Sequence, residues 1–198
     1  SVVRDVSVKL LDDKLNTISK RNMVLHNEAQ LQFRQIELAN NGIVFLLAET
    51  NNRYASKDVN VALFSLDLEK GVAQKKLVNV DDAHATGTHI KLDRKTDVCY
   101  LAGFLSEKKA SSIGSVFYGV YDSETKDAIQ LYITPFSDLI RKEAMASNKR
   151  KPFDNYTIED IIIKNNGGII AIAEANSIVT RSNYSNGYGN FYSPFYSI

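Results

Sequence analysis

Three apolar segments of the chain each end in an aspartate that is followed by a charged turn. The segments are residues 6–12, 61–67 and 116–122, so the two intervals between their aspartates are equal. A fixed period, here about 55 residues, indicates one supersecondary unit that recurs along the chain. The period constrains the fold more strongly than the propensity of any single segment.

A second similarity links two strand–turn–strand segments, residues 33–49 and 158–174. Six positions are identical between them, and both have Asn-Asn-Gly at the centre. Asn-Gly between apolar strands predicts a tight type I′ hairpin, in which both central residues take positive φ. A weaker middle copy at residues 89–103 follows the first at an interval one shorter than that of the aspartates, and it keeps Ile90, Leu92 and Ala102.

Each complete unit is expected to contain four antiparallel strands. The first strand alternates apolar and polar residues, and the third ends at the aspartate. The second strand is continuously apolar, which predicts burial on both of its faces. We place second strands at residues 43–48, 98–102 and 169–173, and fourth strands at residues 75–80 and 128–134.

One segment has a helical pattern. The step from the middle copy to the last is longer than the step before it, and the additional length coincides with residues 137–151. Ser137 or Asp138 is suited to cap a helix there, helix-forming residues follow, and Pro152 is a stop signal. We predict one helix inserted between two units.

Residues 1–198 are predicted to form a single β-propeller-type domain or a fragment of one. We predict an all-β fold of four-stranded antiparallel repeats of about 55 residues, which is typical of β-propeller blades. Residues 195–198 match residues 63–66 of a third strand. The predicted parts are a partial blade at 1–25, blades at 30–80 and 88–135, the helical insertion at 137–151 and a partial blade at 156–198.

The number of predicted blades is about three, whereas a closed propeller usually has at least four. Three completions therefore stay open. The remainder of a longer parent chain completes the ring, two copies form a six-bladed ring, or the strands form another all-β arrangement such as a sandwich.

Composition excludes several classes of protein. Hydrophobic residues make up 44% and charged residues 24%, which suits a packed core. The net charge is only +1, whereas a nucleic-acid binder is expected to have a clearly basic surface. No apolar run approaches the roughly 20 residues of a membrane-spanning helix. The single cysteine, Cys99, lies in an apolar strand and is expected to be a buried free thiol.

Repeated carboxylates are the first candidates for chemistry. Glu49 and Glu174 occupy equivalent positions, and two carboxylates together could do acid–base work or bind a cation. Their recurrence with the fold favours a structural role. Asp12, Asp67 and Asp122 are expected to accept hydrogen bonds from the backbone of their own turns.

A second candidate is the segment 81–89, which contains two aspartates and two histidines. The spacing matches no familiar zinc pattern, and the segment links two units. We therefore predict a solvated loop there. Together these observations predict no catalytic residue, no metal site and no cofactor.

The Tyr-rich segment 181–196 is the most distinctive candidate for recognition. Aromatic residues alternate with Ser, Asn and Gly, a composition found in adaptable recognition loops. Its alternative is an ordinary long hairpin loop. If it binds, the partner is a protein or a glycan, and the contact residues are Tyr184, Tyr188, Phe191 and Tyr192.

Three motifs are the basis of a resemblance to a group of known proteins. They are the Asn-Asn-Gly-Gly turn at 165–168, the Ile-Ile-Ala-Ile-Ala-Glu strand after it and the Tyr-rich insertion. Residues 61–198 resemble uncharacterised exported, β-propeller-like repeat proteins of Bacteroidetes bacteria. The resemblance implies a longer parent protein and a periplasmic or cell-surface location. It implies no activity and no catalytic residue.

The sequence therefore favours a non-catalytic β-propeller-type binding or scaffold module. One alternative is a glycan-acting propeller enzyme whose site lies largely outside this chain. The other is a half-ring that dimerises into a six-bladed propeller.

Overall fold

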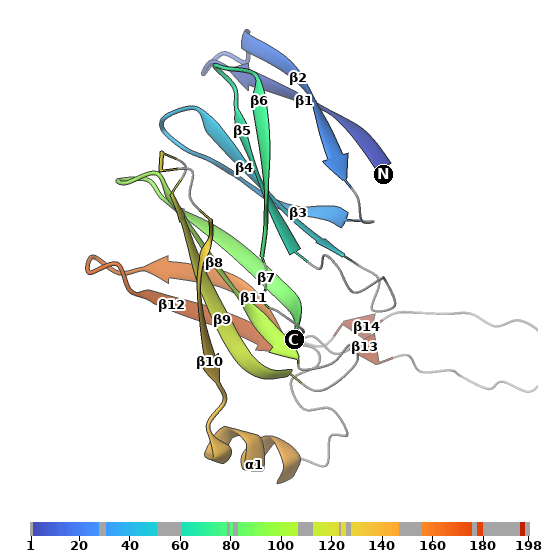
Figure 1. Ribbon diagram of the computed structural model, residues 1–198, viewed down its shortest axis with the longest axis vertical. Coiled ribbons are helices and arrows are strands. Elements are labelled where there is room, and N and C mark those ends of the chain that lie inside the picture. Colours follow the sequence, from blue (N-terminus) through green and yellow to red (C-terminus); the bar gives the residue numbers. More distant parts are fainter. Residues whose placement is uncertain are drawn as a thin grey trace, which may run out of the picture.

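The computed structural model is built almost entirely of antiparallel strands (Figure 1). It describes residues 2–27, 31–50, 61–78, 80, 83–106, 113–122, 124–125, 128–146, 156–175, 178–179 and 195–196. The all-β prediction is confirmed. The strands are β1 (Val2–Leu11), β2 (Thr17–Asn27), β3 (Leu31–Leu38), β4 (Ile43–Thr50), β5 (Val61–Asp67), β6 (Val72–Leu77), β7 (His84–Asp93), β8 (Val98–Ser106), β9 (Ile113–Asp122), β10 (Gln130–Pro135), β11 (Tyr156–Ile163), β12 (Ile169–Ala175), β13 (Ile178–Val179) and β14 (Phe195–Tyr196).

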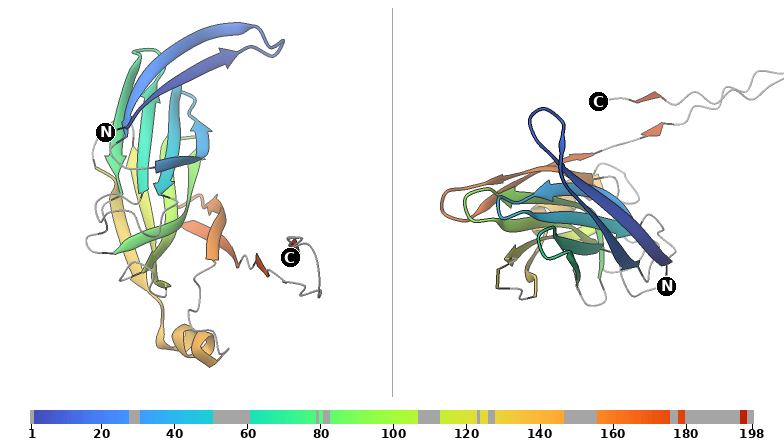
Figure 2. Two further views of the ribbon diagram at one scale, coloured as in Figure 1. Left: turned by 90° about the vertical axis from the view of Figure 1, so that its right-hand side faces the viewer. Right: turned by 90° about the horizontal axis from the view of Figure 1, so that it is seen from above.

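The strands form four main layers in chain order. The first hairpin is β1–β2, the first sheet is β3–β4–β5–β6, the second sheet is β7–β8–β9–β10, and the last hairpin is β11–β12. In both four-stranded sheets each strand pairs with its neighbour in sequence. Figure 1 and Figure 2 show the layers stacked one after another, and we call this arrangement the stack.

The two sheets share a register. In the first sheet Ile43 lies opposite Asp67, and in the second sheet Val98 lies opposite Asp122. The second pair follows the first at the same interval that separates the aspartates in the sequence. Equivalent positions in the two sheets can therefore be compared directly.

The turn after the first strand is one residue longer in the second sheet. Three residues, 40–42, lie between the paired positions Ala39 and Ile43, whereas four residues, 94–97, lie between the paired positions Asp93 and Val98. Consequently, the interval from a residue of β3 to its equivalent in β7 is one residue shorter than the interval from a residue of β4 to its equivalent in β8. The predicted match of Ala102 with Ala48 is therefore wrong by one residue, because Gly103 is the equivalent position.

The Asn-Gly hairpins are confirmed, but the predicted turn type is wrong. Gly42 and Gly167 have φ of +81° and +80°, and the asparagines before them do not have positive φ. In each hairpin a longer loop is closed by backbone hydrogen bonds, Ala39 with Ile43 and Lys164 with Gly168. Glycine takes the left-handed position of this longer loop.

The predicted burial of second strands holds for two of the three. In β4 and β8 the apolar runs are buried, but Ile170 and Ile172 of β12 are 50% and 46% exposed. The prediction is wrong there because the described residues place a neighbouring layer on only one face of the last hairpin. The third-strand match of residues 195–198 is also wrong in register, because Phe195 pairs with Val179 of β13 rather than with β12.

The core consists of three apolar clusters, each between two successive layers. The first hairpin packs on the first sheet, the two sheets pack on each other, and the last hairpin packs on the second sheet. The middle cluster holds the completely buried Phe45, Leu47, Ile90 and Leu101. Cys99 lies in the same cluster and is a buried free thiol, as predicted.

The inserted helix α1 (Asp138–Ala146) lies between β10 and β11. The backbone N–H of Ile140 donates to Ser137 Oγ, so Ser137 is the cap. The remainder of the predicted helix, 147–151, lies outside the described residues. The fourth strand of the first sheet begins earlier than predicted, at Val72. Within the described ranges, α1 falls short of the length and apolar character that a membrane crossing needs.

Candidate functional site

The first strands of three successive layers, β3, β7 and β11, lie next to one another, because β7 contacts both of the others. Each of the three has a bulge near its centre. A bulge inserts an extra residue and re-aims the side chain beside it. The residues directly after the three bulges are Gln35, His89 and Asp160.

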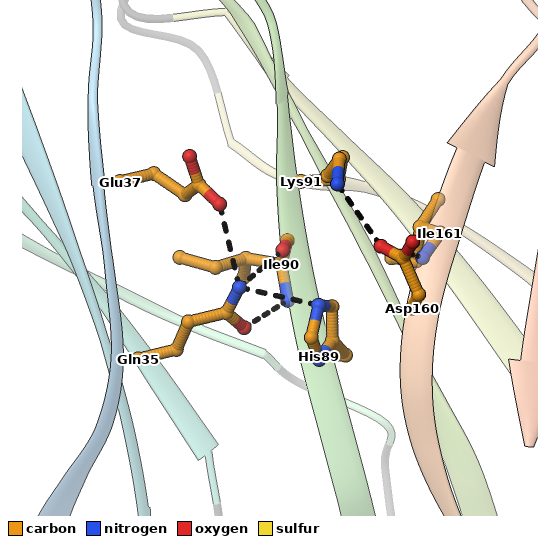
Figure 3. Close-up of polar contacts among 7 residues, drawn as sticks. All are labelled: Gln35, Glu37, His89, Ile90, Lys91, Asp160 and Ile161. Atoms are coloured by element: carbon orange, nitrogen blue, oxygen red, sulfur yellow. Dashed lines mark hydrogen bonds and ion pairs between the residues drawn. The ribbon is translucent and has the colours of Figure 1, made fainter.

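These polar residues and two others form what we call the first-strand track (Figure 3). All of its side chains are partly exposed. Each member contacts another member or the backbone of a neighbouring layer. The members are Gln35, Glu37, His89, Lys91 and Asp160.

Gln35 binds the backbone of the neighbouring layer with both ends of its amide. Its Nε2 donates to the carbonyl oxygen of Ile90 at 2.7 Å, and the N–H of Ile90 donates to its Oε1 at 2.9 Å. Nε2 also lies 3.2 Å from His89 Nε2 and 3.4 Å from Glu37 Oε1. A side chain of the first sheet thereby occupies the outer edge of β7 as a paired strand would.

Lys91 and Asp160 link the second sheet to the last hairpin. Lys91 Nζ lies 3.0 Å from Asp160 Oδ1, which also accepts the N–H of Ile161 at 2.8 Å. The hydrogen bond from Lys91 is the main cause that holds the pKa of Asp160 below its ordinary value. Asp160 is therefore a carboxylate, an acceptor rather than an acid, near neutral pH.

His89 lies between these two links. Partial burial lowers the pKa of its imidazole, although the negative charge of Asp160 acts in the opposite direction. The ring is therefore neutral at pH 7 and presents one donor and one acceptor nitrogen. The track combines an amide, a neutral imidazole, an ammonium group and carboxylates.

Glu49 stands apart from the track and contacts the second sheet at Thr88. Its Oε1 accepts the Thr88 N–H and hydroxyl, both at 3.2 Å, and its Oε2 lies 3.9 Å from Arg34 Nε. The side chain is only 14% exposed. Burial raises the pKa of Glu49, against the hydrogen bonds from Thr88 and the charge of Arg34. Glu174, its sequence equivalent, is exposed on β12, so the two glutamates have different surroundings.

The repeated aspartates have the predicted turn role. Asp12 accepts the N–H of Lys14 and Asn16, Asp67 accepts that of Lys70, and Asp122 that of Glu124. These bonds lower the pKa of Asp12 and Asp67, with the side-chain bonds from Asn16 and Lys70 as the largest causes.

The sequence missed two turn aspartates of the second sheet. Asp93 accepts the N–H of Lys95, and Asp97 accepts the N–H groups of Asn40 and Asn41 from the facing turn of the first sheet. Asp97 has φ of +56°, which Asn, Asp and Gly tolerate best. The two aspartates therefore stabilise a turn and join two layers.

The segment 81–89 is only partly a loop. Strand β7 begins at His84, so the loop prediction is wrong for 84–89, while Asp81 and Asp82 lie outside the described residues. In the part of the chain that the structure describes, no three His, Cys, Asp or Glu side chains are placed to share a metal ion. The contact residues predicted in the Tyr-rich segment, Tyr184, Tyr188, Phe191 and Tyr192, also lie outside the described residues.

Sequence reasoning did not single out the first-strand track. The sequence did contain a usable signal. Gln35, His89 and Asp160 each directly precede an isoleucine that is shared by the three copies. A polar residue at the same place in three copies indicates a shared position in the fold.

Comparison of the chain with protein-family models, curated proteins and solved structures finds no significant match. The function is therefore argued from the geometry of the described residues.

Proposed function

We propose that the chain belongs to a β-propeller-type module that binds a ligand or acts as a scaffold without catalysing a reaction. Two four-stranded meanders with a common register, stacked in chain order with their first strands adjacent, support this reading. Propeller blades are four-stranded meanders arranged around an axis. In such an arrangement the first-strand track faces that axis.

The observation that carries the proposal is the engagement of the track. Gln35 is bound to the Ile90 backbone, and Lys91 is paired with Asp160, which also accepts a backbone N–H. A catalytic acid–base pair needs titratable groups aimed at a reacting atom and poised near the working pH. The track instead holds neighbouring layers together and presents its partly exposed polar groups as a fixed surface.

The chemistry of the track favours an uncharged, hydroxyl-rich ligand. Its charged groups are of mixed sign, and its neutral imidazole can both donate and accept. Hydroxyl groups of a glycan accept and donate in the same way. The Tyr-rich segment 181–196 is retained in this proposal as the second contact surface, where aromatic faces suit a sugar ring or a protein partner.

Affinity gel electrophoresis with soluble neutral polysaccharides tests this proposal. We expect one or more polysaccharides to retard the protein, and Lys91→Gln to weaken that retardation. Lys95→Gln is the matched control because Lys95 is exposed in the turn 94–97. Equal retardation of the two variants would show that the first-strand track does not contact the polysaccharide.

Glu49 is the specific observation in favour of the enzyme alternative. Its buried carboxyl has a raised pKa, which is a property of general acids in glycan hydrolysis. The same polysaccharides are therefore assayed for release of reducing ends. The binding proposal predicts no release above that of buffer. Release that disappears in Glu49→Gln and persists in Glu174→Gln would instead establish an enzyme.

An exported, periplasmic or cell-surface location is proposed on the sequence resemblance alone. Fractionation of cells that express the protein, followed by protease accessibility of intact cells, tests it. Recovery in the cytoplasmic fraction would contradict the proposal.

A further inference from the structure

Near each end of the stack, apolar side chains are exposed that a folded chain normally covers. On the first sheet, Ile36 and Leu38 of β3 are 62% and 45% exposed. On the last hairpin, Ile162, Ile170 and Ile172 are about half exposed. The layers that the described residues provide leave these side chains uncovered.

The interior of the stack shows what covers such positions. Ile90 and Ile161 are the equivalents of Ile36 in the next two layers, and both are completely buried. Ile90 lies in one cluster with Leu47 of the first sheet, and Ile161 lies in one cluster with Ala102 of the second sheet. In both interfaces, the first-strand isoleucine packs in a cluster with the second strand of the preceding layer.

The residue equivalent to Leu47 in the last hairpin is Ile172, because each pairs with the residue directly after the bulge, Gln35 in one case and Asp160 in the other. Among the described residues, Ile36 therefore lacks a preceding second strand, and Ile172 lacks a following first strand. The two exposed surfaces therefore correspond to the two sides of the contact between a first-strand isoleucine and the preceding second strand. The stack contains this contact twice, once between the two sheets and once between the second sheet and the last hairpin.

The strand edges are complementary in the same way. Among the described residues, β12 pairs with β11 and β1 with β2, so each has one edge without a strand. The aspartate spacing makes β1 a third strand, and β12 is a second strand. Pairing β12 with β1 would complete a four-stranded layer in the order β11–β12–β1–β2.

Charge also favours this pairing. The first hairpin, Val2 to Asn27, carries five basic and three acidic residues, whereas Tyr156 to Ala175 carries one basic and three acidic residues. The hairpins therefore have net charges of opposite sign, which favours their association.

We propose that two copies of this chain associate end to end, with β1–β2 of one copy completing the layer begun by β11–β12 of the other. Ile170 and Ile172 then pack on Ile36 and Leu38 of the partner copy. The proposal rests on the propeller-type arrangement and names its partner as a second copy. Two such contacts close a ring of two chains, whereas a non-closing contact would build a filament.

Sedimentation velocity over a range of concentrations tests the association. We expect a species of twice the 22.1 kDa chain mass, and Ile172→Asp to raise its dissociation constant at least about tenfold. Ile133→Asp is the matched control, because Ile133 is 51% exposed on β10, away from both ends. A monomer at every concentration, a filament, or equal effects of the two variants would overturn the proposal.

A disulfide cross-link tests the register. Ala48 lies opposite Ala62 in β4–β5, and the equivalent positions in β12 and β1 are Ala173 and Ser7. We expect Ser7→Cys combined with Ala173→Cys to form a covalent dimer on mild oxidation. Ser7→Cys with Glu174→Cys is the control, because neighbouring residues of a strand point to opposite faces.

The native thiol does not interfere with this test, because Cys99 is completely buried. Equal cross-linking of the two cysteine pairs would overturn the proposed register. The absence of any cross-link would overturn the pairing of β12 with β1 of a second copy. Either failure leaves the polysaccharide assay of the proposed function unaffected, so the two proposals fail separately.

Discussion

Equivalent residues in the middle and at the ends of the stack have the same chemistry but different surroundings. Leu47 is completely buried between the two sheets, whereas its equivalent Ile172 is 46% exposed on the last hairpin. Ile90 is completely buried, whereas Ile36 is 62% exposed. Burial in this fold is therefore decided by whether a neighbouring layer is present, rather than by the sequence of the strand itself.

The largest expected effect comes from deleting one side chain at each of these places. Leu47→Ala leaves a cavity between two packed sheets, so we expect a loss of about 2–5 kcal/mol in the free energy of unfolding. Ile172→Ala removes a half-exposed group, and we expect a loss of less than about 1 kcal/mol. Urea denaturation at concentrations where the protein is monomeric measures both losses. Equal losses would contradict the different burial of Leu47 and Ile172.

A smaller effect is expected at Gly103, where the interior has no space for a methyl group. An added Cβ would lie 2.6 Å from the Phe117 ring and 3.0 Å from Thr88 Oγ1. Gly103→Ala should therefore cost about 1–3 kcal/mol in stability. The control is Gly114→Ala, because nothing lies within 4 Å of a Cβ there. Similar thermal or urea stability of the two variants would contradict the close packing.

The two links of the first-strand track are expected to differ in strength. Gln35→Ala leaves the N–H and C=O of Ile90 without their partner amide, so we expect a loss of about 1–3 kcal/mol. Lys91→Met breaks an ion pair whose side chains are 40% and 47% exposed, and solvent weakens such pairs. We therefore expect a smaller loss for Lys91→Met, measured by urea denaturation. The reverse order would show that the charged link, rather than the amide, joins the layers.

The smallest effect is a change in pH dependence. Because burial raises the pKa of Glu49 in the folded state, the folded chain binds this proton more tightly than the unfolded chain. Its stability should therefore fall as pH rises from the ordinary Glu pKa of 4.5 to the raised value. Above the raised value this contribution is constant.

Glu49→Gln keeps an acceptor for Thr88 and removes the titration. We expect its advantage over the native chain to grow with pH across that window, as followed by thermal unfolding. Glu174→Gln is the matched control, since Glu174 is exposed. A parallel pH profile for the native chain and Glu49→Gln would contradict the buried-carboxyl description.

The sequence predicted those parts of the fold that local patterns specify. The strand order, the hairpins at Gly42 and Gly167, the Ser137 cap and the turn role of Asp67 all follow from short-range chemistry. It did not predict the one-residue difference between turns, because the added residue at Asp97 gives no strong signal in a single chain. That residue moved the equivalent of Ala48 from Ala102 to Gly103.

The candidate site was harder to predict for a different reason. The roles of Gln35 and Asp160 depend on which strand lies beside them, and that is a property of layer stacking rather than of the sequence around each residue. Exposure of Ile172 was mispredicted for the same reason, since a continuous apolar run indicates burial only where both neighbouring layers exist. Tertiary neighbours therefore decide both the site and the exposed ends.

Hydrogen exchange on β4 and β12 tests the central claim most directly. In a dilute monomer, we predict that amides of β4 are protected throughout residues 44–49, because both edges of the strand are paired there. Alternate amides of β12 should exchange much faster, because only the edge facing β11 is paired. Equal protection of the two strands in the monomer would instead show that β12 keeps its protection without the neighbours that β4 has.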